Sequence, residues 1–391
     1  MGTWIRKYRA IVSSGAAALA GAAAWSGYIA AVPLSCCFLL VFLLQPDRRA
    51  AYRVAFVYYA ASSWPLVPGA HAFFGPNSHV WQGAALWLAA SILLAAPWGL
   101  AHFRTWPARY WSVSMALAAT SLPPLGLIGW ASPLTSAGVV FPGTGWFGII
   151  AVCFLPALII DRPRLGLVFA AALMVLAHTM HPGDPAALKA WEAVDTKFGG
   201  SESELPDAIR EFQNAEWIEQ RALNSGARVI VFPETVVPRW NDATEAFWDP
   251  TLQALAAKGK TLLLGATIPI PASPERLNGI IIRGAGEASV FLQHVPPPIS
   301  MWKPWTDSGF PLRLSGAGTV RVADQRAGVL ICYELLLTWP ILSMSLEHPT
   351  VLVGVANDYW ASRTSIPAVQ RVALSAWARL FWLPTVMAVN T

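Results

Sequence analysis

Charged residues are scarce in this sequence. Only 13% of the 391 residues are Asp, Glu, Lys or Arg, whereas 55% are hydrophobic. Such a composition is typical of a chain that lies partly in a membrane. The formal net charge is +5, but the basic residues stand in short clusters between apolar runs rather than in one patch. We therefore expect no direct nucleic-acid binding.

Cysteine is also rare, with four residues in the chain. Cys36, Cys37 and Cys153 lie in apolar runs, where cysteine usually behaves as a small buried hydrophobic residue. Cys332 is the only cysteine of the second half, and it has neither a disulfide partner there nor a Cys or His at the spacing of zinc ligands. The sequence therefore predicts no disulfide framework, no metal site and no cofactor.

The chain divides near residue 184 into two parts of different composition. Residues 1–183 contain long apolar runs and predict a transmembrane domain of about seven spans, since ~20 apolar residues cross the hydrocarbon core of a bilayer. Residues 184–391 have an ordinary charge content and predict a globular domain. The expected spans are Ile11–Ala31, Pro33–Leu44, Val54–Phe74, Trp81–Phe103, Trp111–Ile128, Val139–Ile160 and Leu165–Met180.

The basic residues between the apolar runs predict the orientation of these spans. Lys and Arg precede the first span and follow the second, fourth and sixth, whereas the loops after the first, third and fifth contain neither. The positive-inside rule then places the N-terminus in the cytoplasm and the globular domain in the periplasm, beside a bacterial inner membrane. A re-entrant second segment, which is short, would reverse that last assignment. An uncleaved anchor is favoured over a signal peptide at the N-terminus, because the first apolar run is long and further spans follow.

Residues 184–391 alternate between short apolar strands and amphipathic helices. This alternation predicts an α/β domain in which helices cover sheets. Helices are expected at Ser203–Asn224, Phe247–Lys258 and Ile366–Phe381, and strands at Trp191–Thr196, Arg228–Phe232, Thr261–Ala266, Ile280–Arg283, Ser289–Leu292, Val329–Cys332, Thr350–Ala356 and Thr385–Val389.

Three polar clusters follow predicted strands, at positions suited to catalysis. Glu234 stands just past a buried strand, where a carboxylate can act as a general base, although a helix cap or a solvated loop charge would explain it equally well. Cys332 ends another apolar strand, so its sulfur has little freedom, as a nucleophile requires. Asn357 and Asp358 follow a third strand, where they either line a substrate entrance or cap an Asx-turn.

The clusters read Phe-Pro-Glu, Cys-Tyr-Glu and Asn-Asp-x-Trp, and in that order they resemble the nitrilase (carbon–nitrogen hydrolase) superfamily. Together with the N-terminal spans they look like the apolipoprotein N-acyltransferases. The segment 191–199 and the shortened C-terminus are similar to the TraB-type conjugal transfer proteins. The resemblance implies an N-terminal α-helical transmembrane bundle followed by a nitrilase-like α-β-β-α sandwich, truncated at its C-terminus.

The resemblance also implies roles for individual residues. Glu234 matches the general base of the family, Cys332 its nucleophile, and Glu334 the carboxylate two residues on. In the family the cysteine attacks a carbonyl group, an acyl-thioester forms, and an amine or water resolves it. The residues expected to line the substrate are Asn278, Gln293, Tyr333, Asn357, Asp358 and Trp360.

The sequence departs from the family pattern at the catalytic lysine. Gln293 stands at that position, and Met301 replaces a further glutamate. Loss of one oxyanion donor costs roughly 3 kcal/mol, or about 10²–10³ in rate. We expect Lys303, the nearest lysine, to supply the missing charge, with Gln293 as a secondary neutral donor.

These observations are interpreted as a TraB-like membrane-bound conjugal transfer factor whose Cys domain acts on an amide or an acyl ester. A catalytically silent nitrilase-fold scaffold of the transfer apparatus is the alternative, favoured by Gln293 and the short C-terminus. An apolipoprotein N-acyltransferase is a further alternative, disfavoured by Gln293 and Met301. The expected partners are inner-membrane lipids, a lipid or acyl substrate, and conjugal transfer proteins.

Overall fold

The computed structural model of the chain describes residues 2–75, 78–199 and 207–391. By their contacts the residues form two compact units. Unit 1 comprises Met1–Pro185, Leu336–Trp339 and Arg363–Trp382, and unit 2 comprises Ala186–Leu335, Pro340–Ser362 and Leu383–Thr391. The chain therefore leaves unit 2 and returns to it twice before its end.

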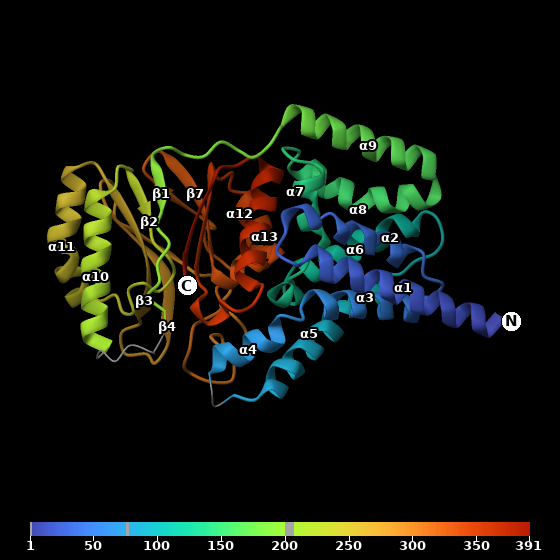
Figure 1. The fold of residues 1–391 in the computed structure, drawn as a ribbon, viewed down its shortest axis with the longest axis horizontal. Coiled ribbons are helices and arrows are strands. Elements are labelled where there is room, and N and C mark those ends of the chain that lie inside the picture. Colours follow the sequence, from blue (N-terminus) through green and yellow to red (C-terminus); the bar gives the residue numbers. More distant parts are fainter. Residues whose placement is uncertain (1, 76–77, 200–206) are drawn as a thin grey trace. The chain divides into compact units, whose positions relative to one another are not determined.

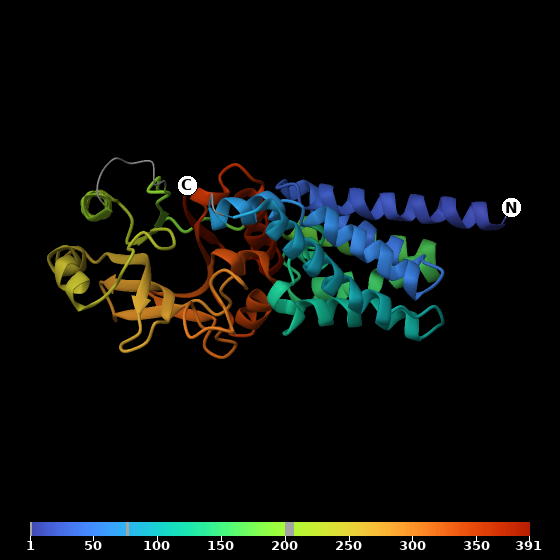
Figure 2. The same ribbon diagram turned by 90° about the horizontal axis from the view of Figure 1, so that it is seen from below.

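Unit 1 consists of helices, and Figure 2 shows α1 and α3 running side by side within it. Its core is aromatic: Phe38 stacks on Tyr58 with 4.1 Å between ring centroids, and Trp98 meets Phe38 edge-on at 4.7 Å. The helices are α1 (Gly2–Ala24), η1 (Ile29–Ala31), α2 (Leu34–Leu43), α3 (Arg48–Ser62), α4 (Leu66–Phe74), α5 (Val80–Leu100), α6 (Ala108–Ser121), η2 (Leu125–Ile128), η3 (Pro133–Ser136), α7 (Ala137–Val140), α8 (Trp146–Asp161), α9 (Pro163–Met180) and α13 (Ile366–Phe381).

The third predicted span, Val54–Phe74, is wrong as a single helix. The structure has α3 and α4 there, separated at Ser63–Pro65. Pro65 has no amide hydrogen to continue the hydrogen bonding of α3, so the helix ends before it. Two helices in the described part of the chain, α5 and α9, are long and apolar enough to cross a membrane, and α8 is a shorter apolar helix. The seven-span arrangement stays a prediction.

Helix α13 packs closely on α7 inside unit 1. A Cβ atom added at Gly138 would lie 1.6 Å from the carbonyl oxygen of Ala376, so only glycine permits this approach. The carbonyl oxygens of Arg379 and Leu380 accept hydrogen bonds from the amides of Gly143 and Gly145. The contacts of α13 thus bind it to the N-terminal helices, although it was predicted as part of the globular domain.

Unit 2 contains two β-sheets (Figure 1). The first has the order β1-β2-β3-β4-β5, with β1, β2 and β3 parallel and β4 antiparallel to both β3 and β5. The second has the order β6-β7-β8-β9, with β7, β8 and β9 parallel. The strands are β1 (Trp191–Ala193), β2 (Val229–Val231), β3 (Thr261–Pro269), β4 (Arg276–Gly284), β5 (Ser289–Leu292), β6 (Thr319–Val322), β7 (Gln325–Ile331), β8 (Val351–Asn357) and β9 (Thr385–Asn390).

The two sheets pack face to face. Val231 and Leu263 of the first sheet share one buried core with Ile331 and Val353 of the second. Helices α10 (Asp207–Asn224) and α11 (Asp242–Ala257) cover the outer face of the first sheet, as Figure 1 shows. Met344 of α12 (Thr338–Ser345) contacts the second sheet at Gly328.

This layered arrangement agrees with the predicted nitrilase-like sandwich. The sequence did not predict β6 and α12, both of which are short. Residues 203–206 of the first predicted helix lie outside the described residues.

Candidate active site

Glu234 lies just beyond β2, and the chain there is held against β3. A Cβ atom added at Gly265 would lie 2.2 Å from the carbonyl oxygen of Pro233 and 2.5 Å from the Cα atom of Glu234. Glycine is therefore required at position 265 for the Glu234 segment to approach the strand. The side chain of Glu234 is only 4% exposed.

Cys332 follows β7 directly and begins the 3-10 turn η4 (Cys332–Leu336). Its φ of +52° lies in the left-handed region, which non-glycine residues occupy mainly where surrounding structure enforces it. The thiol donates a hydrogen bond to the Glu234 carboxylate. The predicted base and nucleophile, 98 positions apart in the sequence, are thus in direct contact.

The Glu234–Cys332 pair is buried, and burial controls its protonation. Burial raises the pKa of the Glu234 carboxyl, and it raises the pKa of the Cys332 thiol well above its ordinary value, with the negative charges of Glu234 and Asp358 adding to the second effect. The main-chain N–H of Asn357 opposes both shifts, because it donates to Glu234 Oε2 at 2.9 Å and to the Cys332 sulfur. Burial thus favours the protonated form of each group, whereas the Asn357 N–H favours the charged forms.

Asn278 and Gln293 complete this buried network. Asn278 Nδ2 donates to Glu234 Oε1 at 2.6 Å and to Gln293 Oε1 at 3.0 Å. Gln293 Nε2 in turn donates to the carbonyl oxygen of Ile331 at 3.0 Å. Gln293 thus joins Asn278, which contacts Glu234, to Ile331, which precedes Cys332.

Glu334 is also buried, but its partners are main-chain amides. Its carboxylate accepts from the N–H groups of His294 (2.7 Å), Val295 (2.9 Å) and Ile331 (2.9 Å). Burial raises the pKa of Glu334 to about 7. These bonds tie the segment after β5 to the turn that carries Cys332, so Glu334 fixes the backbone around the site.

Lys303 lies in a loop that folds back toward β4. Within this loop the amide of Phe310 donates to the carbonyl oxygen of Met301, and the amide of Arg276 donates to that of Gly309, both at 2.9 Å. The loop is therefore anchored two residues from Asn278. In the described part of the chain no hydrogen bond or ion pair joins the Lys303 side chain to Glu234 or Cys332.

The other residues predicted to line the substrate flank the pair. Tyr333 follows Cys332 in η4, and burial raises the pKa of its hydroxyl. Asp358 is fully buried next to the end of β8, and Trp360 lies in the short helix η5 (Tyr359–Ala361). Their positions at two strand ends are those the sequence predicted, and their roles stay predictions.

Two residues of this region were missed by the sequence analysis. Asn390, at the end of β9, donates from Nδ2 to Asn357 Oδ1 at 2.8 Å, and its own Oδ1 accepts from Thr196 Oγ1 at 2.8 Å. The signal available was an Asn directly after an apolar strand, the same pattern that drew attention to Asn357.

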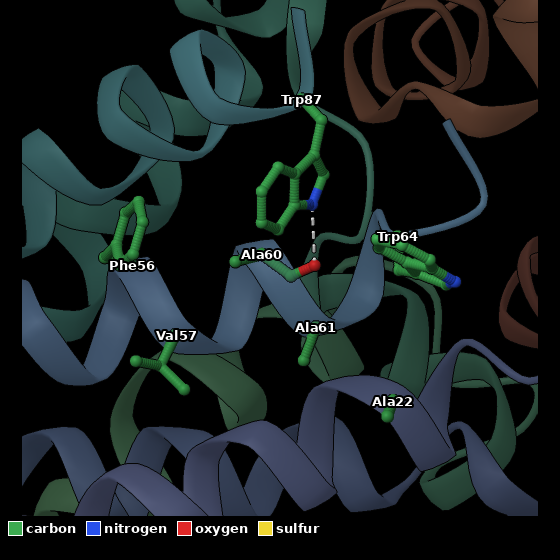
Figure 3. Close-up of a pocket in the computed structure, with 7 residues that line it drawn as sticks. All are labelled: Ala22, Phe56, Val57, Ala60, Ala61, Trp64 and Trp87. Atoms are coloured by element: carbon green, nitrogen blue, oxygen red, sulfur yellow. Dashed lines mark hydrogen bonds between the residues drawn. The ribbon is translucent and has the colours of Figure 1, made fainter. Parts of the chain in front are cut away.

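Unit 1 contains a separate apolar pocket of about 460 Å³ (Figure 3). Trp87 forms one wall and is fixed there by a 2.8 Å hydrogen bond from its indole N–H to the carbonyl oxygen of Ala60. The other lining residues are Ala22, Phe56, Val57, Ala61 and Trp64. None of the seven titrates near neutral pH, so the pocket carries no acid–base chemistry.

Two proteins are similar in sequence to this chain over nearly its whole length. The chain is 31% identical to the "Probable conjugal transfer protein TraB" of Sinorhizobium fredii, over 96% of this chain and 97% of the relative. It is also 31% identical to the "Conjugal transfer protein TraB" of Agrobacterium fabrum, over 95% and 90%. The chain belongs to the TraB family of conjugal transfer proteins.

This chain has more distant similarities to an acyltransferase and to amide-hydrolysing proteins. An apolipoprotein N-acyltransferase of Pseudomonas syringae pv. tomato is 23% identical over 82% of this chain and 71% of its own. Among solved structures, a carbon–nitrogen hydrolase of Helicobacter pylori G27 (12% identical, TM-score 0.39) and an amidase of Nesterenkonia sp. (14%, TM-score 0.37) each align with 51% of this chain and 73% of their own. No family model matches the chain.

Proposed function

We propose that this member of the TraB family is a membrane-bound acyl-transfer or amide-hydrolysing enzyme of the conjugal transfer apparatus. The observation that carries the proposal is the hydrogen bond from the Cys332 thiol to the buried Glu234 carboxylate, at the ends of strands from two facing sheets. A structural cysteine has no need of a buried carboxylate partner, since burying a carboxylate is costly. A nucleophile needs one, because the thiol must lose its proton as it attacks.

The proposed reaction follows from the roles of these two groups. Glu234 takes the thiol proton while Cys332 Sγ bonds to the carbonyl carbon of an amide or acyl ester. The tetrahedral oxyanion collapses, the C–N or C–O bond breaks, and the leaving amine or alcohol receives the proton from Glu234. Water or an amine then attacks the acyl-thioester and gives its proton to Glu234, which restores the thiol.

The absence of a lysine at position 293 is expected to lower the reaction rate at this site. Gln293 is a neutral donor and offers no charge to a thiolate or an oxyanion. The loop that carries Lys303 is anchored beside Asn278, which supports Lys303 as the source of that charge. An acyl ester is the better substrate for such a site, because its leaving group requires less stabilisation than an amide nitrogen does.

A catalytically silent scaffold is the second candidate function, and Gln293 is the observation that favours it. In that case the Glu234–Cys332 contact only stabilises unit 2. An apolipoprotein N-acyltransferase activity is less well supported, because Gln293 and Met301 stand where the family resemblance implies a lysine and a glutamate.

The membrane placement is supported by the basic loops of unit 1. Arg9 donates to the carbonyl oxygen of Leu44, and Arg48 lies 5.9 Å from the ring centroid of Phe103. Arg109 pairs with Asp161. These contacts bring the start of α1 and the loops after α2, α5 and α8 to one end of the helices, as the predicted cytoplasmic face requires. We infer a multi-pass inner-membrane protein with unit 2 in the periplasm.

The test of the function is a covalent acyl group on Cys332. Protein purified from membranes of cells that carry the transfer genes is digested and analysed by mass spectrometry, with Cys332→Ala as the matched control. An acyl mass on the peptide that contains Cys332, absent after treatment with hydroxylamine, is expected. A free thiol in every preparation, together with wild-type plasmid transfer by Cys332→Ala, contradicts the enzyme and leaves the scaffold.

A further inference from the structure

Four chain segments of unit 2 are joined by a buried network of hydrogen bonds beside the Glu234–Cys332 pair. Asn390 is at its centre and is only 4% exposed. Its Oδ1 accepts from Thr196 Oγ1 and from the amide of Phe198, both at 2.8 Å. Its Nδ2 donates to Asn357 Oδ1, also at 2.8 Å. Every polar atom of the Asn390 side chain therefore has a protein partner.

Asn357 connects this network to the Glu234–Cys332 pair. Its Nδ2 donates to Thr235 Oγ1 at 2.9 Å, and its main-chain N–H donates to Glu234 Oε2 at 2.9 Å and to the Cys332 sulfur. Thr235 has a φ of +51°, so its backbone is held in the left-handed region beside Glu234. One main-chain N–H group thus contacts both the base and the nucleophile.

The main-chain amide of Phe198 fixes the donor and acceptor roles in the network. The Phe198 amide can only donate, so the Asn390 atom that faces it must be the oxygen. The nitrogen of Asn390 then faces Asn357, whose facing atom must be its oxygen, and the nitrogen of Asn357 is left for Thr235. An aspartate at position 390 would replace the donor to Asn357 Oδ1 with a second acceptor.

We propose that Asn390, with Thr196 behind it, is a positioning residue that holds Asn357 so that its N–H serves Glu234 and Cys332 together. Thr196 lies beyond β1 of the first sheet and Asn390 ends β9 of the second, and the two pair as an isolated β-bridge. The network therefore joins the edge strands of both sheets close to Glu234 and Cys332, which must stay aligned. This inference rests on the proposed function, because positioning matters only where Cys332 reacts.

The test measures the rate at which a small uncharged electrophile alkylates Cys332 as a function of pH, in full-length protein in membranes. Asn390→Ala removes the donor to Asn357. Thr196→Val removes only the hydroxyl and preserves the shape of the side chain, and Thr196→Ser is its matched control. One lost hydrogen bond corresponds to about a threefold to tenfold lower rate, with the pH midpoint of alkylation moved upward. Thr196→Ser is expected to stay at the wild-type level.

A merely structural role is separated by repeating the substitutions in a Glu234→Gln background. If Asn390 positions the N–H that Glu234 and Cys332 share, Asn390→Ala has a smaller effect on the alkylation rate there, since only the contact with Cys332 is left to lose. Equal effects in both backgrounds, or an unchanged pH midpoint at normal folded protein levels, overturn the proposal. If Asn390→Ala does not accumulate in the membrane, the pair Thr196→Val and Thr196→Ser decides by the same criteria. If the proposed function itself is wrong, the result differs: Cys332 of the wild-type protein is alkylated no faster than Cys332 of the Glu234→Gln protein.

Discussion

Gln293 Nε2 lies 3.0 Å from the carbonyl oxygen of Ile331, the residue before Cys332. A side chain from the segment after β5 of the first sheet thereby bonds to the last residue of β7 in the second. Gln293 Oε1 simultaneously accepts from Asn278, which donates to Glu234. Gln293 therefore links the Asn278–Glu234 contact of the first sheet to the residue before Cys332 through neutral groups.

Cys332 is expected to be the reactive thiol of the protein. A small uncharged alkylating reagent applied to native membranes should modify Cys332 ahead of Cys36, Cys37 and Cys153, and Glu234→Gln should lower the rate about 10²-fold, as loss of a general base does. The modified peptides are quantified by mass spectrometry, with Cys332→Ser as the control. Modification that occurs only after denaturation would mean that Cys332 is a structural core residue.

Lys303 is expected to act with Cys332. Lys303→Ala should lower both alkylation of Cys332 and plasmid transfer about as strongly as Cys332→Ala lowers transfer, since members of one catalytic unit are not additive. Lys258→Ala, which removes an exposed lysine at the end of α11, is the matched control and should leave both unchanged.

Gln293→Lys should partly restore the Lys303→Ala protein, because it returns a positive charge to a position bonded to Asn278. Wild-type transfer by Lys303→Ala, Glu234→Gln and Cys332→Ala, at normal membrane levels, would support the scaffold.

Glu334 is expected to make the stability of unit 2 fall as the pH rises. Its pKa of about 7 in the folded protein is above that of an exposed Glu, so its favourable contribution is complete below about pH 4.5 and is lost as the pH rises through 7. The free energy of unfolding should decrease by roughly 2–3 kcal/mol between pH 5 and pH 8.

The measurement is thermal unfolding in detergent across that pH range. Glu334→Gln should have a lower midpoint at pH 5, because its amide nitrogen cannot accept from one of the three main-chain amides, but a flatter pH dependence. A pH dependence as steep as that of the wild type would assign the effect to another group.

Gly265 is expected to be essential for the placement of Glu234. Gly265→Ala puts a Cβ atom 2.2 Å from the carbonyl oxygen of Pro233, so the Glu234 segment must move, at a cost of about 1–3 kcal/mol. Alkylation of Cys332 should fall at least tenfold. Gly226→Ala is the matched control, since nothing lies within 4 Å of the added atom. Equal alkylation rates in the two variants would show that Glu234 tolerates displacement.

The orientation in the membrane is tested with reporter fusions. Alkaline phosphatase, which folds only outside the cytoplasm, should be active when fused after Gly183 and inactive when fused after Arg104, in a predicted cytoplasmic loop. A cytoplasm-only reporter should give the opposite pattern. Activity of that second reporter after Gly183 would reverse the placement of unit 2 and favour a re-entrant second segment.

The sequence alone predicted the described strands except β6, and it singled out Glu234 and Cys332, which follow two of these strands. These are local properties, since a short apolar run bounded by turn residues forms a buried strand almost wherever it lies. The helix Ile366–Phe381 was also predicted with its observed bounds. Hydrophobic periodicity does not encode the surface on which a helix packs, so its contacts with α7 came only from the folded chain.

Only the tertiary structure decided which polar residues meet. Asn390 and Thr196 are 194 positions apart, and nothing in either local pattern relates them, yet parallel pairing of β8 with β9 brings Asn390 to Asn357. Glu334 and Gln293 were likewise assigned by position in a motif, whereas their partners include main-chain groups of distant segments. The physical reason is that hydrogen bonds between distant segments depend on strand register and sheet packing, which form only when the whole chain folds.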